Sequence, residues 1–165
     1  MARSRSDAPV VLSVLDRLVD EDPRRSEEAP LSRAQSVREM KAAVRRDLEW
    51  LLNTRQPLEA APEGSQLERS LFSYGLPDVT SMSISSLKDR QRLTEAIEQA
   101  LVKFEPRIAN VRVTLLSTGA ENIPVLRFLI EGLLRLDPSP EPVRFDTLLD
   151  MASKEYKVQG ETSAR

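Results

Sequence analysis

The sequence predicts an α+β domain in which two or three helices precede a small antiparallel sheet. Three observations lead to this fold class. Apolar residues recur with the period of an α-helix in two long segments before Pro106. After Pro106 they alternate with polar residues, as in half-buried strands. The chain has 165 residues, enough for one domain with a hydrophobic core but short for two.

The first helix is predicted over residues 10–20, and it is followed by a linker. Proline disfavours helix in the residue before it, so the acidic residues 20–22 and then Pro23 end the helix. Residues 21–35 are mostly polar or charged, and we therefore assign residues 1–35 to a short helix and a linker. The apolar side chains expected to form the core-facing stripe are Val11, Val14, Leu15 and Leu18.

Two longer helices are predicted before Pro106. Ser36, followed three residues later by Glu39, has the spacing of a capping box, which predicts a helix from Ser36 to about Asn53. A polar loop follows over residues 54–66, and residues 67–72 could begin a short helix. Ser86 is the expected cap of the next helix. The core-facing stripe of that helix is expected to be Leu87, Leu93, Ile97, Leu101 and Phe104.

Strands are predicted over residues 108–117, 125–136 and 143–149, with the option of a helix at the end of the second. The inward side chains are expected to be Val111, Val113, Leu115, Leu126, Phe128 and Ile130. The last ten or so residues carry no apolar pattern. The sequence therefore predicts a single domain over residues 36–152 and a flexible tail over residues 153–165.

The composition excludes several kinds of chemistry. The chain has no Cys and no His, which excludes disulfides, thiol nucleophiles and a Ser-His-Asp triad. The balance of 24 basic and 26 acidic residues argues against general electrostatic binding of nucleic acid. A pair of carboxylates, as in a peptidoglycan hydrolase, is the main enzymatic route left. However, Glu39, Asp47 and Glu49 sit among basic residues, as on a solvated helix face.

No segment approaches the ~20 apolar residues of a membrane span, and residues 8–15 lack the cleavage site of a signal peptide. We therefore expect a cytoplasmic protein without direct membrane insertion. Five scattered glycines form no phosphate-binding loop, and residues 20–22 lack the ligand spacing of a calcium loop. Neither a cofactor nor a metal is expected.

Five segments, spread in order over nearly the whole chain, resemble the baseplate wedge family of contractile-tailed phages, historically labelled lysozyme-like. They are residues 15–18 (LDRL), 46–55 (RDLEWLLNTR), 73–78 (SYGLPD), 104–113 (FEPRIANVRV) and 143–147 (VRFDT). The TssE proteins of type VI secretion systems are members of this family.

The resemblance implies a non-enzymatic structural subunit of a baseplate docked at the inner membrane. It implies the wedge proteins TssF and TssG as partners, the sheath subunits TssB and TssC, and TssK as a further candidate. It also implies a sheet edge to which a sheath segment adds a strand, so that this subunit templates sheath polymerisation. A peptidoglycan hydrolase using a carboxylate pair is the alternative function.

Glu105, Pro106 and Arg107 are the candidate partner-binding residues. Without the resemblance they would be interpreted as a helix stop between two exposed charges. With it, proline fixes the direction of the chain, and the two charges can specify how a partner docks. The same charges could instead satisfy groups inside this domain, and that alternative stays open at this stage.

Overall fold

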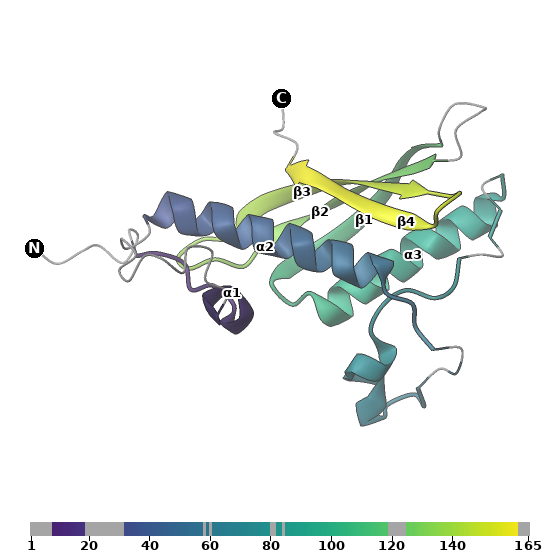
Figure 1. The fold of residues 1–165 in the computed structure, drawn as a ribbon, viewed down its shortest axis with the longest axis horizontal. Coiled ribbons are helices and arrows are strands. Elements are labelled where there is room, and N and C mark those ends of the chain that lie inside the picture. Colours follow the sequence, from purple (N-terminus) through teal and green to yellow (C-terminus); the bar gives the residue numbers. More distant parts are fainter. Residues whose placement is uncertain are drawn as a thin grey trace, which may run out of the picture.

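The computed structural model describes residues 8–18, 32–57, 59, 61–79, 82, 83, 85–118 and 125–161. Its helices come first and its sheet follows (Figure 1). In chain order the elements are α1 (Val14–Leu18), α2 (Arg33–Asn53), the short 3-10 helices η2 (Gln66–Arg69) and η3 (Leu71–Ser73), α3 (Leu87–Phe104), β1 (Ile108–Thr118), β2 (Val125–Leu134), β3 (Glu141–Asp150) and β4 (Glu155–Glu161).

The strands form an antiparallel meander in the order β1-β2-β3-β4, so the predicted α+β class is confirmed. Strands β1 and β4 are the two edges of the sheet. Helix α2 packs against β4, and helix α3 packs against β1. The strand alternation predicted for residues 108–117 and 125–136 is also confirmed. The inward side chains of the sheet include Val111, Val113, Leu126, Phe128, Ile130, Val143, Phe145 and Leu149, and they share one core with helix residues that include Val44, Leu48, Leu52, Leu93, Ile97 and Leu101.

The N-terminal segment differs from the prediction. Helix α1 covers only residues 14–18, and the predicted core-facing stripe of Val11, Val14, Leu15 and Leu18 is exposed. Two neighbouring residues that were not in the stripe, Val10 and Leu12, pack against the core instead. The acidic residues 20–22 and most of the predicted linker lie outside the described residues.

The start of α2 also differs, because the capping box is formed by Ser32 and Gln35 rather than by Ser36 and Glu39. Ser36 is buried inside the helix, where its Oγ accepts a hydrogen bond from the backbone N–H of Val10 at 2.9 Å. The two pairs have the same spacing, so sequence alone could not separate them.

Helix α3 begins and ends as predicted. Ser86 caps it by accepting a hydrogen bond from the backbone N–H of Asp89, and Phe104 is its last residue. Of the predicted stripe, Leu93, Ile97 and Leu101 are buried, and Phe104 is packed against the core. Leu87, in the first turn of the helix, is exposed and does not belong to the core.

The predicted tail is the largest correction. Residues 155–161 form the edge strand β4, and within it Tyr156 and Val158 are buried. Two apolar residues in a polar segment are too weak a signal by themselves, but pairing with β3 turns both toward the core. The third predicted strand is longer than expected and begins at Glu141. None of the helices in the described ranges combines the length and apolar character needed to cross a membrane.

Candidate functional site

The candidate site is the corner between α3 and β1. The backbone N–H of Glu105 still donates to the carbonyl of Leu101 at 2.9 Å, so Glu105 closes the helix. Pro106 follows and is exposed. The carbonyl of Arg107 accepts a hydrogen bond from the backbone N–H of Arg135 at 2.8 Å, which fastens the corner to the chain that follows β2.

The two charges of the corner bind each other. Arg107 donates from Nε to Oε1 of Glu105 at 2.6 Å, and its Nη2 donates to Oε2. This bidentate pairing matches the fork of the guanidinium to the two carboxylate oxygens. Glu105 is only 4% exposed, so its charge is compensated inside the domain. The hydrogen bond with Glu105 is the main reason that the pKa of Arg107 is raised, against the opposing effect of burial.

The ion pairs continue from the corner across α2 to α1. Arg107 Nη2 also donates to Oδ2 of Asp47 at 2.6 Å. The other oxygen of Asp47 accepts from Arg46 Nη2 at 2.9 Å, and the same Nη2 donates to Oδ1 of Asp16 at 2.7 Å. Ser13 Oγ donates to the other oxygen of Asp16 at 2.5 Å. We call these residues the corner network: Ser13, Asp16, Arg46, Asp47, Glu105 and Arg107.

Asp16, at the end of the network, is nearly buried. Burial alone would raise its pKa, but hydrogen bonds from Ser13 Oγ and from Arg46 outweigh that effect, and the pKa of Asp16 is lowered. The hydrogen bond to Asp16 in turn raises the pKa of Arg46. Both shifts favour the charged forms, so the network holds fixed ions at neutral pH.

Tyr74 brings a further segment to the corner. Its ring meets that of Phe104 edge to face, with centroids 5.3 Å apart. Burial and the nearby carboxylates of Asp47 and Glu105 raise the pKa of Tyr74. Gly75 follows with φ +110°, and a Cβ there would lie 2.4 Å from the carbonyl oxygen of Thr54. Glycine is therefore required for this loop to approach the end of α2.

The segment after Asp47 fastens α2 to the sheet. The side-chain amide of Asn53 donates to the carbonyl of Tyr156 at 2.9 Å and accepts from its N–H at 2.8 Å. Arg55 Nη2 donates to the carbonyl of Lys154 at 2.9 Å. Asn53 and Arg55 thus bind backbone groups at the start of β4 that a further strand would otherwise bind.

The structure thus supports the alternative in which Glu105 and Arg107 satisfy groups within the domain. Glu105 is not free to receive an arginine of a partner, whereas Pro106 and part of the Arg107 guanidinium remain at the surface. That Glu105, Pro106 and Arg107 bind a partner stays a prediction. Sequence reasoning did not identify Asp16, Arg46 or Asp47 as members of the site, although residues 15–18 and 46–55 both belong to the segments that carry the family resemblance.

The described residues contain no group of three acidic side chains placed to hold a metal ion. Of the acidic residues considered for catalysis, Asp47 lies in the corner network, bound on both oxygens by arginines. The ion pairs of the corner thus connect the turn between α3 and β1 to α2 and α1.

A comparison with protein families identifies the chain. The family model described as "Baseplate wedge protein gp25" matches residues 38–139. The chain belongs to this baseplate wedge family. Comparisons with curated proteins and with solved structures found no significant match.

The family match confirms the resemblance seen in the sequence and indicates a baseplate wedge component, a structural role. The matched region runs from the first third of α2 to the chain before β3, and it contains four members of the corner network: Arg46, Asp47, Glu105 and Arg107. Helix α1 with Asp16, and strands β3 and β4, lie outside it.

Proposed function

We propose that the chain is a TssE-type subunit of a type VI secretion baseplate, docking to TssF and TssG and templating the first ring of the TssB–TssC sheath. In this proposal it acts without catalysis, in the cytoplasm, in a baseplate docked at the inner membrane, with TssK as a further candidate partner. Family membership supports the baseplate role. The observation that carries the templating role is the difference between the two edges of the sheet.

The β4 edge is occupied at its start. Both backbone groups of Tyr156 are bound by the amide of Asn53, and α2 packs along this strand. An incoming strand would have to displace that side chain to pair there. An edge covered in this way does not add strands readily.

The β1 edge is open by the same criterion. Among the described residues, residues 109–118 exchange backbone hydrogen bonds only with β2. Strand β2 lies along one side of β1, and the other side of β1 is the edge of the sheet. The pairing with β2 is irregular after Ala109 and after Leu115, and regular between Arg112 and Leu115. Since bulges interrupt a ladder, the regular stretch is where an added strand would find continuous backbone partners.

Amide hydrogen exchange tests this proposal directly. Binding of purified TssB–TssC should slow exchange in residues 109–118, because new backbone hydrogen bonds protect the amides. Exchange in β4 should change little. Co-purification of the chain with TssF and TssG tests the wedge role separately. Unchanged exchange in β1, or protection of β4 alone, would overturn the assignment of the β1 edge.

A further inference from the structure

Arg112 is exposed on the outer face of β1, the strand at the open edge of the sheet. Its neighbours in the strand, Val111 and Val113, are buried in the core, so alternation turns the guanidinium of Arg112 to the opposite face. Within the described ranges, no carboxylate forms an ion pair or a hydrogen bond with Arg112. Its charge is therefore available at the edge to which the proposed function assigns an added strand.

A row of alternating charges crosses the outer face of the sheet and ends at Arg112. Arg144 of β3 is directly opposite Glu131 of β2, and Glu131 is directly opposite Arg112 of β1. Arg144 Nε forms an ion pair with Glu131 Oε1 at 2.9 Å, so this carboxylate is bound on the side away from the edge. The row holds two positive charges and one negative charge, and the arginine at the edge is the one without a partner.

A strand added to β1 would place one side chain directly beside Arg112. Neighbouring strands lie about 4.8 Å apart, and side chains directly opposite each other have Cβ atoms about 5 Å apart. Opposite charges at such positions stabilise the pairing, and like charges destabilise it. Arg112 begins the regular stretch of β1, which ends at Leu115, so an Asp or Glu opposite Arg112 would continue the alternation of charges across the sheet.

The inner side of β1 is less completely covered than that of the strand beside it. Val111 and Val113 are 8% and 6% exposed, and Leu115 is only half-buried. By contrast, Phe128 and Ile130 of β2 are each 1% exposed. Because side chains alternate along a strand, the residues on either side of an acidic residue opposite Arg112 would point to this inner side. Apolar residues at those positions would complete the cover of the core.

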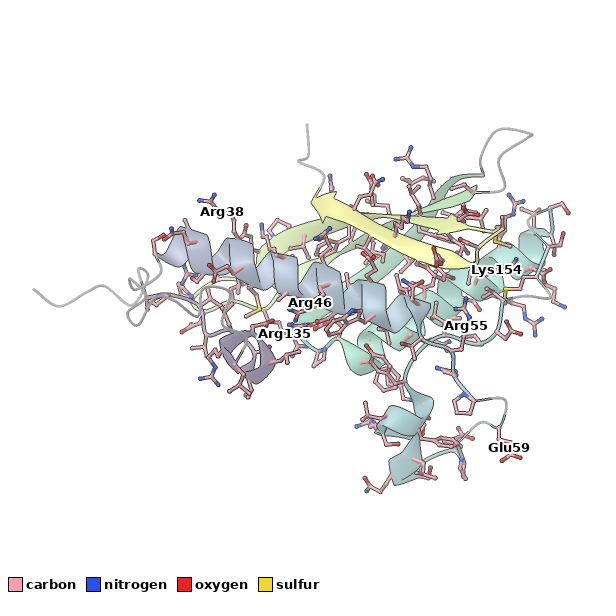
Figure 2. The ribbon with its side chains drawn as sticks, viewed as in Figure 1. Arg38, Arg46, Arg55, Glu59, Arg135 and Lys154 are labelled. Atoms are coloured by element: carbon pink, nitrogen blue, oxygen red, sulfur yellow. The ribbon has the colours of Figure 1, made fainter. Side chains whose placement is uncertain are left out.

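The edge at β4 differs in both respects. Lys157 is exposed there, but the residue directly opposite it on β3 is a leucine rather than a carboxylate. The inward residues Tyr156 and Val158 are more completely buried than the valines of β1. Arg55 donates to the carbonyl of Lys154, and Figure 2 shows both residues where the end of α2 meets the turn before β4. Charge and burial thus both favour the β1 edge.

We infer that the β1 edge binds an extended segment of the sheath complex that carries an Asp or Glu opposite Arg112 and apolar residues on either side of it. The backbone of β1 binds the segment, and Arg112 selects it and sets its register. A shift by one residue would turn the acidic side chain to the apolar inner face. The inference rests on the proposed function, and it adds a residue that determines specificity and the chemistry of the partner segment.

Binding of purified TssB–TssC to the full-length chain tests the inference. Arg112→Glu should weaken binding about tenfold or more, because it sets one carboxylate against another. Arg112→Gln removes the charge without adding a repulsion, and it should weaken binding about threefold. Added salt should weaken binding of the unmodified chain more than that of Arg112→Gln, because salt screens the charge pair. Lys157→Glu is the matched control, a charge reversal on the other edge strand, and should bind within about twofold of the unmodified chain.

Circular dichroism checks that each variant folds, and each outcome has a defined meaning. If TssB–TssC binds and protects β1, but both Arg112 variants bind as well as the unmodified chain, the inference is overturned while the templating role stands. If TssB–TssC does not bind the unmodified chain, the templating role fails and the inference fails with it. Equal weakening by Lys157→Glu would show a general charge effect and would overturn the inference. Self-association of Arg112→Gln with unchanged binding of TssB–TssC would also overturn it, because Arg112 would then only keep the edges of two copies apart.

Discussion

Arg107 and Asp47 are 60 residues apart in the chain, and their side chains meet at 2.6 Å between Nη2 and Oδ2. The contact ties the α3–β1 corner to the middle of α2. Asp47 passes the connection on to Arg46 and so to α1. Three segments of the chain are therefore positioned by one set of ion pairs, and this relationship leads to the first two predictions.

Arg107→Ala is expected to destabilise the fold. It leaves the carboxylate of Glu105 buried without its partner, which costs roughly 3 kcal/mol or more of unfolding free energy. Urea unfolding measures the change. Arg127→Ala is the control, because the Arg127 side chain is half exposed and its ion pair with Asp146 is long, at 3.9 Å. That variant should lose less than about 0.5 kcal/mol, and equal losses would contradict a structural role for the network.

Asp16 should make the stability depend on pH. Its pKa is lowered from 3.8 on folding, so its contribution is present above about pH 4 and is lost as pH falls through the folded value. The unfolding free energies of the unmodified chain and of Asp16→Asn should differ at pH 7 and converge below about pH 4. A difference that stays constant between pH 7 and pH 3 would show that Asp16 does not titrate in this way.

Asn53→Ala should uncover the β4 edge. Two backbone groups of Tyr156 lose their partner, which costs about 1–3 kcal/mol if both stay buried. Amide exchange at Tyr156 should become faster, and light scattering should show more self-association, because an open edge can pair with another chain. Slow exchange at Tyr156 in the variant would mean that packing of α2, rather than the amide, covers this edge.

Tyr156 offers a test of whether β4 belongs to the domain. Tyr156→Ala removes a buried ring and should cost about 3–5 kcal/mol, whereas Lys157→Ala at the exposed neighbouring position should change stability by less than about 0.5 kcal/mol. Tyr156→Phe should be neutral or stabilising, because the hydroxyl is buried without a hydrogen-bond partner. A stable Tyr156→Ala variant would support the tail that the sequence predicted.

Gly75→Ala should be far more harmful than Gly64→Ala, although both glycines have positive φ. A Cβ at Gly75 would lie 2.4 Å from the Thr54 oxygen, whereas a Cβ at Gly64 would meet nothing within 4 Å. Both variants incur the backbone strain of about 1 kcal/mol, and only Gly75→Ala must also move the chain. Thermal unfolding of the two variants gives the comparison, and similar melting temperatures would contradict the close approach.

Periodicity predicted the fold where it is strong. The spacing of Leu93, Ile97 and Leu101 and the alternation of Leu126, Phe128 and Ile130 identified α3 and β2, because a helix or a half-buried strand repeats its environment at a fixed interval. It failed at both ends of the described chain. Tyr156 and Val158 carry too few apolar positions to signal a strand, and α1 has a clear apolar stripe that the fold turns outward.

Local pattern was enough to predict the α+β class, the cap of α3 at Ser86, its end before Pro106, and the segments that carry the family resemblance. The groups that Glu105 and Arg107 pair with, the side of α1 that faces the domain, and the pairing of β4 with β3 became known from the three-dimensional structure alone. Local pattern depends on neighbours within a few residues, and it records that a side chain is charged or apolar. The partner of that side chain depends on how distant segments pack together, as in the ion pair between Arg107 and Asp47.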